Sequence, residues 1–306
     1  MATHVIGIDL GGTNLRAGLF EGKSLVRSET IPSRLRPGTS RDAKALADIV
    51  EQLIRKLVAG SSWAPTGIAA IGVVASGPID AASGVILNDF TLPDWSGVPW
   101  LGELGDRFGV PTPIENDAMG ALIGEVGAGA ARGADVAAMV TLGTGIGVAV
   151  HSSSTGPMRG TRGCHPEGGH VPIGLPPAGI QSVPDCYCGI RGCFESVASG
   201  EALHSLWTSP AGEIDWLGYG RAVLRGLQFV ARAFGPDLIV IGGGVADRFD
   251  QFCDPVYEWF GGGPRHDWPM ADEMGVPGGT RIVRAALDEP GLHGAAAIAY
   301  QASTAR

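Results

Sequence analysis

The sequence of 306 residues lacks both a long apolar segment and a run of basic residues. Its longest charge-free apolar stretch of note, residues 136–150, contains three glycines, whereas a membrane-spanning helix needs about 20 strongly apolar residues. Lysine and arginine number 22 against 31 aspartate and glutamate residues, so the formal net charge is −9. An acidic chain without basic clusters does not favour an anionic partner. We therefore expect neither a membrane nor a nucleic acid as a partner.

Cysteine is also scarce. The chain has five cysteines, an odd number, and three of them lie within eight consecutive positions. The first ten residues lack a basic segment and already include Asp9, so they do not have the pattern of a signal peptide. In a large chain without an export signal, bunched cysteines favour metal binding over a disulfide framework. We therefore expect a cytoplasmic protein.

Glycine, by contrast, is abundant, and its 49 residues make up about 16% of the chain, more than twice the average share of about 7%. Apolar segments separate the glycines and no collagen-like period is present, so low-complexity disorder is not indicated. Three clusters follow strand-like segments, at residues 11–12, 143–147 and 242–244. Backbone N–H groups in such turns can face a ligand without interference from a Cβ atom. The clusters are therefore candidate phosphate-binding turns.

The length indicates about two domains at roughly 150 residues each, and the pattern of expected elements restarts in the middle of the chain. Strands at 4–9 and 15–20 flank the first glycine turn, and residues 137–150 repeat this strand–turn–strand plan. We interpret the repeat as an internal duplication, with two unrelated hairpins as the alternative. Ser40 is placed to cap the first helix. The other expected elements are helices at 42–58, 118–127, 223–234 and 292–301 and strands at 68–74, 111–114 and 238–241.

The first glycine turn does not match the common nucleotide-binding motifs. Residues 17–24 fit a loose Walker A pattern, but the supposed loop is the end of a strand and no helix follows it. The glycines at 11–12 lack the spacing of the dinucleotide fingerprint. Asp9 directly before a Gly-Gly-Thr turn does suit a site in which the carboxylate holds hydrated Mg²⁺ and the turn meets phosphates. For this motif alone, a plain tight turn remains the alternative.

Cys186, Cys188 and Cys193 form a Cys-x-Cys-x4-Cys motif, which offers three thiolates from one compact loop. Zn²⁺ takes four ligands in a tetrahedron, so the motif predicts a zinc site with a histidine as the natural fourth ligand. Both His170 and His165 lie upstream in the same segment. The alternative is a set of buried or redox-active cysteines.

Asn116–Asp117 lies between an expected strand and an expected helix. Phosphoryl transfer to an alcohol needs a carboxylate near the attacking hydroxyl, which Asp117 could supply. As a bare dipeptide, however, Asn-Asp is more often a helix cap than a base. The residues by themselves leave both roles open.

Together these motifs resemble the ROK family of sugar kinases (repressors, open reading frames, kinases), part of the group that shares the actin/hexokinase ATPase fold. The resemblance runs from about residue 4 to Ala297, and its motifs are residues 9–13, 116–117, 142–147 and 241–244. It implies a two-domain α/β fold of the actin-like ATPase (ribonuclease H-like) type with a zinc-binding loop. Residues 1–117 plus about 288–306 would form the N-terminal domain. Residues 118–287 would form the C-terminal domain, with the zinc loop at 164–195.

The resemblance also implies the residues that bind the nucleotide and the metal ions. Glu167-Gly168-Gly169-His170 matches the family motif before the cysteines, which favours His170 as the fourth ligand of a structural Zn²⁺ beside Cys186, Cys188 and Cys193. The residues implied for ATP and Mg²⁺ are Asp9, Gly11, Gly12 and Thr13, then Gly143, Thr144, Gly145 and Gly147, and finally Gly242, Gly243 and Gly244.

For the sugar, the resemblance implies hydrogen bonds from its hydroxyls to Glu167, His170 and Glu195. Asn116 would contact the sugar, Asp117 would be the catalytic base, and Gly77 would lie in the pocket wall. The expected activity is ATP-dependent phosphorylation of the 6-hydroxyl of a hexose, with glucose the first choice. A homodimer or tetramer is expected.

The sequence leaves alternatives for the sugar, the phosphoryl donor and the class of protein. N-acetylmannosamine, N-acetylglucosamine, allose and fructose are possible sugars, because the segments beside the expected pocket depart from the usual glucokinase pattern, and polyphosphate is a possible donor. A sugar-sensing transcriptional regulator is a remote alternative, because the first phosphate strand starts at about His4 and leaves no room for a preceding helix-turn-helix. A non-catalytic sugar-binding module is a third alternative. Such a module would not need Asp9, Asp117 and both glycine turns, all of which the sequence contains.

Overall fold

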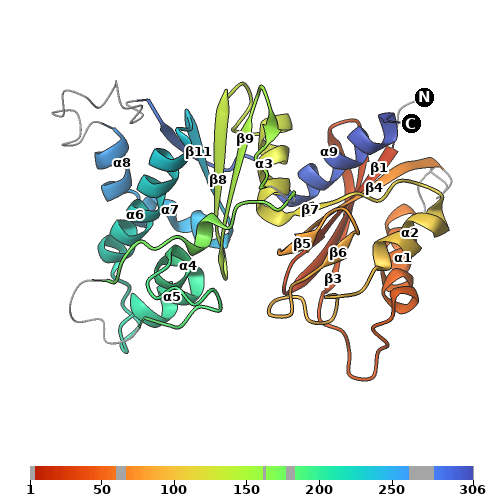
Figure 1. Cartoon of the computed structure of the whole chain (residues 1–306), viewed down its shortest axis with the longest axis horizontal. Helices are drawn as coiled ribbons and strands as arrows, with labels where there is room; N and C mark the ends of the chain where they lie inside the picture. The colour runs from red at the N-terminus through yellow and green to blue at the C-terminus, as the bar shows by residue number, and fades with distance from the viewer. Residues whose placement is uncertain (1–3, 60–66, 161–162, 177–182, 262–278, 306) are drawn as a thin grey trace. The chain divides into compact units, whose positions relative to one another are not determined.

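The computed structural model describes residues 4–59, 67–160, 163–176, 183–261 and 279–305, and Figure 1 shows its elements. Within these ranges no helix combines the length and the apolar character needed to cross a membrane. The strands are β1 (His4–Leu10), β2 (Asn14–Glu21), β3 (Ser24–Pro32), β4 (Ile68–Ala75), β5 (Ile79–Asp80), β6 (Val85–Ile86), β7 (Ile114–Asn116), β8 (Val136–Leu142), β9 (Ile146–Ser152), β10 (Gly156–Pro157), β11 (Leu238–Gly242) and β12 (Arg281–Arg284). The α-helices are α1 (Ala43–Val58), α2 (Trp100–Phe108), α3 (Asp117–Ala128), α4 (Phe194–Ala198), α5 (Gly200–Leu206), α6 (Trp216–Phe234), α7 (Phe249–Phe252), α8 (Asp254–Phe260) and α9 (Pro290–Thr304), and the 3₁₀ helices are η2 (Gly168–His170) and η3 (Gly244–Arg248).

The contacts divide the chain into two compact units. The first unit consists of Met1–Arg132, Arg159–His165 and Leu287–Arg306, and the second of Gly133–Met158 and Pro166–Ala286. This division differs from the expected boundary after residue 117, because α3 packs along α9 and therefore belongs to the first unit. The short segment 159–165 also lies with the first unit, although the chain on both sides of it belongs to the second.

The first unit is built on a five-stranded sheet in the order β3-β2-β1-β4-β7. β1 is antiparallel to β2 but parallel to β4, and β4 is parallel to β7. The apolar faces of α1 and α2 pack against one face of this sheet around Ile8, Val73 and Trp100. The helix α9 packs on the other face around Val5 and Leu292, and Figure 1 shows α9 and the α1–α2 pair on opposite sides of the strands.

Glycines allow α9 to lie unusually close to its neighbours. A Cβ atom at Gly72 in β4 would overlap the backbone carbonyl of Ala295, and one at Gly294 would overlap the carbonyl of Gly120 in α3. Because protein interiors are close-packed, no room for these atoms can be made without moving the helix. Part of the large glycine content therefore serves helix packing rather than the predicted turns.

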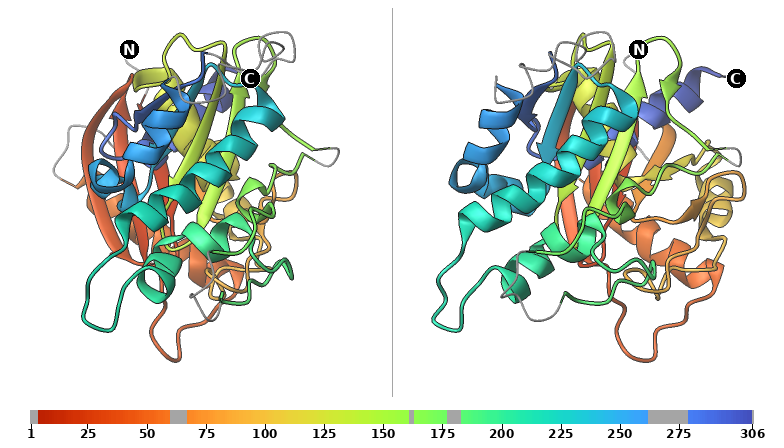
Figure 2. Two further views of the ribbon diagram at one scale, coloured as in Figure 1. Left: turned by 90° about the vertical axis from the view of Figure 1, so that its left-hand side faces the viewer. Right: turned by 60° about the vertical axis from the view of Figure 1, so that its left-hand side comes forward.

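The second unit repeats the same plan in a five-stranded sheet of order β10-β9-β8-β11-β12. β8 is antiparallel to β9 and parallel to β11, as β1 is to β2 and β4. The long α6 lies across one face of this sheet, as Figure 2 shows, and buries Val223, Leu227 and Val230 against Val140 and Ile241. The shared strand plan is the arrangement expected for a duplicated strand–turn–strand unit.

The predicted strands at 4–9, 15–20, 68–74, 137–142 and 238–241 are confirmed within one or two residues at their ends. The cap of α1 differs from the prediction, since Asp42 is the N-cap and its carboxylate accepts from the Ala45 N–H. Ser40 instead donates its hydroxyl to Asp42 (2.7 Å). The strand β3 and the helix α2 were not predicted, because β3 is half-exposed with an irregular pattern and α2 is short and contains two glycines.

Candidate functional site

Three neighbouring parallel strands of the first unit end together and carry the predicted polar residues at their carboxyl ends. Leu10 of β1 is paired in register with Ala75 of β4, and Ala75 with Asn116 of β7. Asp9 thus lies at the end of β1, Ser76 follows β4, and Asp117 follows β7. Ligand sites of open α/β sheets form at this carboxyl edge.

The glycine turn after β1 is held by backbone contacts. The Gly11 N–H donates to the Asn14 carbonyl (2.9 Å), and the Thr13 carbonyl accepts from the Ser33 N–H (3.0 Å). A Cβ atom at Gly12 would lie 3.4 Å from the Thr91 carbonyl, so the backbone of the turn lies close to the loop 87–97.

Asp9 lies in a site that disfavours its negative charge. Burial raises the pKa of Asp9, as do the carboxylates of Asp117 and Glu289, and although Arg16 lowers it, the pKa of Asp9 is about 7. The Arg16 guanidinium lies 3.6 Å from both carboxylates, those of Asp9 and Glu289. The first turn of α9 also abuts Asp9, because a Cβ atom at Gly291 would lie 2.7 Å from Asp9 Oδ2. A carboxylate in this state is well prepared to bind a cation, which would restore its charge.

Asn116 and Asp117 have different roles at the junction of β7 and α3. Asn116 is the N-cap, and its side-chain oxygen accepts from the Ala118 and Met119 N–H groups. Asp117 is the first helical residue, and its Oδ2 accepts the Ser76 hydroxyl at 2.8 Å. The cap interpretation is therefore correct for Asn116, while the Asp117 carboxylate is available at the helix N-terminus, where the helix dipole stabilises negative charge.

Gly77 belongs to a loop that Asn88 holds. The Asn88 side-chain amide donates to the Gly77 carbonyl (2.6 Å) and to the Thr91 hydroxyl (2.6 Å), and its oxygen accepts from the Thr91 N–H. Asn88 is 4% exposed. Asn88 was not predicted as a site residue, because it lies in a loop without a recognisable pattern.

An ion pair between the buried Glu115 and the partly exposed Arg159 supports the Asn116–Asp117 junction. Glu115 is 4% exposed, and both of its carboxylate oxygens accept from the guanidinium of Arg159. Glu115 Oε1 also accepts the Asn116 N–H at 2.7 Å. Arg159 comes from the short segment 159–165, and no local pattern indicates a partner that lies 44 residues away from Glu115.

The second unit carries its own glycine turn between β8 and β9. The Gly143 N–H donates to the Gly145 carbonyl (3.0 Å), and the Gly200 N–H donates to the Gly143 carbonyl (2.7 Å). The Gly147 N–H is bound by the Thr141 hydroxyl (3.1 Å). Thr144, at the tip of the turn, is exposed. These bonds fix the turn between the end of β8 and the start of α5.

The third glycine cluster lies beside this turn. β11 is parallel to β8, with Gly242 paired with Thr141. Gly243 has a φ of 84° and lies so close to Leu142 that a Cβ atom would overlap its carbonyl, whereas a Cβ atom at Gly244 would meet nothing within 4 Å. Gly243 therefore requires glycine for both its conformation and its close contact.

Glu195 links the cysteine loop to the glycine turn. Its Oε2 accepts the Ile146 N–H (2.9 Å), and its Oε1 lies 3.7 Å from Cys186 Sγ. A Cβ atom at Gly145 would overlap this carboxylate. The carboxylate predicted to bind a sugar hydroxyl thus also supports the turn.

The ligand atoms of His170, Cys186, Cys188 and Cys193 all lie within 4.8 Å of one another. His165 belongs to the segment 159–165 of the first unit, whereas His170 lies with the cysteines in the second. The Cys186 Sγ to His170 Nδ1 distance is 3.5 Å. Zn–S bonds of about 2.3 Å and Zn–N bonds of about 2.0 Å in a tetrahedron separate sulfur from nitrogen by about 3.5 Å. The donor set therefore fits Zn²⁺.

The surroundings shift the pKa values of this cluster in different directions. Hydrogen bonds from His170 and Ser196 hold the pKa of Cys193 to about 6 against the effect of burial, while the nearby thiol and carboxylates raise the pKa of His170. Burial raises the pKa of Cys186. A thiolate is the form of cysteine that ligates zinc.

His170 has a second partner outside the cluster. Its Nε2 lies 2.8 Å from the Tyr187 hydroxyl, and the two rings meet edge to face with centroids 4.9 Å apart. Glu167 directly precedes η2, and its carbonyl accepts the His170 N–H (3.0 Å). Tyr187 was not predicted as a site residue, because an aromatic residue between two cysteines carries no signal of its own.

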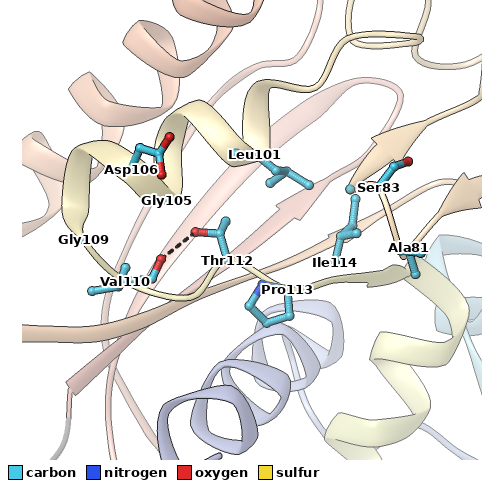
Figure 3. A pocket seen from close by; sticks show the side chains of 13 residues that line it. Ala81, Ser83, Leu101, Gly105, Asp106, Gly109, Val110, Thr112, Pro113 and Ile114 are labelled. Carbon is cyan, nitrogen blue, oxygen red and sulfur yellow. Dashed lines mark hydrogen bonds between the residues drawn. The ribbon is translucent and has the colours of Figure 1, made fainter. Parts of the chain in front are cut away.

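A pocket of about 460 Å³ lies elsewhere on the first unit. Figure 3 shows it between α2, the β5–β6 turn and the segment that leads into β7, with the Thr112 hydroxyl bound to the Val110 carbonyl. Small residues such as Ala81, Ser83 and Gly105 line most of it, and it includes none of the predicted site residues.

Two sheets of the same strand plan, glycine turns after their first strands and aspartates at a carboxyl edge are the features of the actin-like ATPase fold. The family model "ROK family" matches residues 5–302, and the chain belongs to that family. A glucokinase of Thermotoga maritima is 30% identical over 291 residues, which cover 83% of this chain and 86% of that protein. The xylose repressor of Bacillus subtilis is 28% identical over 202 residues, covering 66% of this chain and 49% of that protein.

Solved structures agree with this assignment. The crystal structure of a ROK hexokinase from Thermus thermophilus is 32% identical with a TM-score of 0.72, over 97% of this chain and 98% of that one. A ROK family glucokinase from Streptomyces griseus in complex with glucose and AMPPNP is 25% identical with a TM-score of 0.73, over 97% and 99% of the two chains.

Proposed function

We propose that this chain is a sugar kinase that transfers the γ-phosphoryl group of ATP to the 6-hydroxyl of a hexose, with glucose as the first candidate. The relatives that support this proposal include a glucokinase and a structure that holds glucose and an ATP analogue. The observation that carries it in this chain is the Asp117 carboxylate at the N-terminus of α3, bound to the Ser76 hydroxyl at the carboxyl edge of the sheet.

In the proposed reaction, Asp117 accepts the proton of the attacking sugar hydroxyl. Its Oδ1 and Oδ2 accept from the Ala118 N–H and from Ser76, respectively, and each carboxylate oxygen has a second lone pair for the substrate. Asn116 would contact the sugar beside it, and the loop that contains Gly77 would form part of the wall. General-base catalysis of this kind contributes about 10²- to 10⁴-fold.

The glycine turns would hold the nucleotide. Gly11, Gly12 and Thr13 in the first unit and the segment 143–147 in the second would offer backbone N–H groups to phosphates, with Gly242–Gly244 beside the adenosine. Asp9 would hold Mg²⁺, which when bound neutralises phosphate charge. A chain with a net charge of −9 would thus bind its anionic nucleotide locally.

The cluster of His170, Cys186, Cys188 and Cys193 would hold a structural Zn²⁺. Four protein ligands leave no open coordination position, as is typical of structural sites. Its effect would be to fix the loop that carries Glu167 and Glu195, whose carboxylates would accept hydrogen bonds from sugar hydroxyls.

The test is ADP release with ATP and Mg²⁺ against glucose, N-acetylmannosamine, N-acetylglucosamine, allose and fructose, with polyphosphate as a second donor. The position of the product phosphate is read by ³¹P–¹H NMR. Asp117→Asn should lower kcat at least about 10²-fold. The matched control is Asp106→Asn, because Asp106 is an exposed aspartate of α2 in the same unit.

The absence of ADP release with every sugar, together with measurable sugar binding by calorimetry, would instead support a sugar-sensing regulator, as the xylose repressor among the relatives suggests. We further propose a cytoplasmic homodimer or tetramer, which light scattering after size-exclusion chromatography would measure.

A further inference from the structure

The side-chain amide of Asn88 is buried, with the residue 4% exposed, and it is bound through both of its polar atoms. Nδ2 donates to the Gly77 carbonyl and to the Thr91 hydroxyl, each at 2.6 Å, with the Ser76 carbonyl at 3.3 Å. Oδ1 accepts the Phe90 N–H (3.1 Å) and the Thr91 N–H (2.9 Å). Because an amide has two donor protons and an oxygen with two lone pairs, these contacts use its full capacity.

The Nδ2 group of Asn88 holds the segment that orients the proposed base. The Ser76 hydroxyl donates to Asp117 Oδ2 at 2.8 Å, so the place of the Ser76 backbone sets the place of that hydroxyl. The Ser76 N–H itself makes only a long bond to the Leu10 carbonyl (3.4 Å). The shorter bond from Asn88 to the Gly77 carbonyl therefore supplies much of what fixes this backbone.

The loop 87–97 that contains this amide is itself joined to the first glycine turn. A Cβ atom at Gly12 would lie 3.4 Å from the Thr91 carbonyl and 3.6 Å from the Thr91 Cβ, so the two backbones lie close together. The buried Trp95 donates its indole N–H to the Ser33 carbonyl (2.8 Å), and the Ser33 N–H donates to the same turn (3.0 Å). The loop thus connects the turn after β1 with the segment after β4.

We infer that Asn88 is a positioning residue of the proposed kinase, which holds Ser76, and through it the Asp117 carboxylate, in a fixed place relative to the turn at 11–13. This inference rests on the proposed function, because it deepens the description of that site. The amide has no polar capacity left for a substrate, so Asn88 acts through Ser76. Reacting groups must be aligned closely, since a misplacement of about 1 Å can cost about 10²-fold in rate.

The kinetic test is Asn88→Asp, which keeps the size of the side chain and an acceptor for the Phe90 and Thr91 N–H groups but removes the N–H donors. The kcat should fall about three- to tenfold, the loss expected for one hydrogen bond, with the KM for ATP unchanged, because backbone bonds hold the turn at 11–13. The kcat is taken on the plateau of the pH profile, since a new carboxylate raises the pKa of neighbouring carboxyl groups. The matched control is Gln52→Glu, the same chemical change at an exposed residue of α1, which should leave both constants unchanged.

Coupling to Ser76 separates positioning from a general loss of structure. If Asn88 acts through the Ser76 hydroxyl, Asn88→Asp should lower kcat much less in the Ser76→Ala background than in the wild type. Thr91→Val removes the other short acceptor without adding charge, should show a loss of the same sign with the same coupling, and serves as the test if Asn88→Asp does not fold. Unchanged kcat values, or losses that multiply fully with that of Ser76→Ala, would overturn the inference while leaving the kinase function intact.

A second readout does not depend on activity. The Leu87 N–H donates to the Pro78 carbonyl (2.8 Å), directly beside the carbonyl that Asn88 binds. In Asn88→Asp, the Leu87 amide should exchange with solvent faster, whereas the Phe90 and Thr91 amides should stay protected. Equal exchange of Leu87 in the wild type and in Asn88→Asp would overturn the inference. If the wild type phosphorylates no sugar, the proposed function fails, and this exchange experiment still decides whether Asn88 holds the segment.

Discussion

Arg159 binds the buried carboxylate of Glu115 with both terminal nitrogens of its guanidinium, 44 residues away along the chain. The same carboxylate accepts the N–H of Asn116, which caps the helix that begins with Asp117. The pair raises the pKa of Arg159 above its ordinary value. A buried carboxylate is costly unless it is paired and hydrogen-bonded, so this contact supports the backbone that presents the proposed base.

Arg159→Met should destabilise the chain by about 1–3 kcal/mol, because it leaves the buried Glu115 carboxylate without its partly exposed cation. The double variant Glu115→Gln/Arg159→Met removes that charge and keeps an acceptor for the Asn116 N–H, so much of the loss should be recovered. Urea titrations measure the free energy of unfolding of the single and the double variant. Equal destabilisation in the single and double variants would contradict the desolvation argument.

Ser76→Ala should reduce kcat by about three- to tenfold without a change in the KM for ATP, because Asp117 Oδ2 loses the hydroxyl that orients it (2.8 Å). Steady-state kinetics on the best sugar of the panel provides the measurement. Ser83→Ala is the control, since this serine is exposed and its hydroxyl donates to Asp80, away from Asp117. An unchanged kcat in Ser76→Ala would show that the serine does not orient the base.

The stability of the metal-free chain should depend on pH through Asp9. Its folded-state pKa of about 7 lies above the ordinary value of 3.8, so the folded chain binds this proton more tightly than the unfolded chain does. The penalty from charged Asp9 is complete above pH 7 and disappears as the pH falls. Between pH 8 and pH 6, Asp9 should therefore contribute about 1.4 kcal/mol of added stability.

The Asp9 effect is measured as a difference between the wild type and Asp9→Asn in urea titrations at the two pH values. Mg²⁺ affinity should change in the opposite direction, weakening as the pH falls below 7, because the cation competes with the proton. A wild type and an Asp9→Asn variant with the same pH dependence would argue against the raised pKa.

Removal of zinc should lower the melting temperature and loosen the second glycine turn, because Glu195 joins the cysteine loop to the Ile146 N–H. Cys188→Ser should lose most of the bound zinc, measured by inductively coupled plasma mass spectrometry. Cys164→Ser, at an exposed cysteine outside the cluster, should retain it. Equal zinc content in the two variants would contradict the ligand set.

Gly294→Ala should destabilise the chain by about 1–3 kcal/mol, since the added methyl group would overlap the Gly120 carbonyl in the α3–α9 contact. Gly102→Ala serves as the control, because a Cβ atom there meets nothing within 4 Å and alanine favours the helix by about 0.5–1 kcal/mol. In thermal unfolding, the melting temperature should therefore fall for Gly294→Ala and rise for Gly102→Ala.

Local sequence patterns were sufficient to predict those features whose physical cause lies in neighbouring residues. Short apolar runs and the glycine turns between them predicted β1, β2, β8 and β9, because strand preference and turn conformation depend on neighbouring residues. The spacing of Cys186, Cys188 and Cys193 likewise predicted a metal cluster from one loop. The Asn116–Asp117 pair was placed correctly at a helix start for the same reason.

The relationships that define the environment of the site join residues far apart in the sequence. Arg159 and Glu115, Ser76 and Asp117, and Tyr187 and His170 are 44, 41 and 17 residues apart. The fold also decided the choice of His170 over His165 and the position of α3 in the first unit. The sequence by itself determined the strands, the turns and the types of chemistry available. Only the tertiary structure decided which side chains share a buried volume, because burial and pairing depend on how the strands and helices pack.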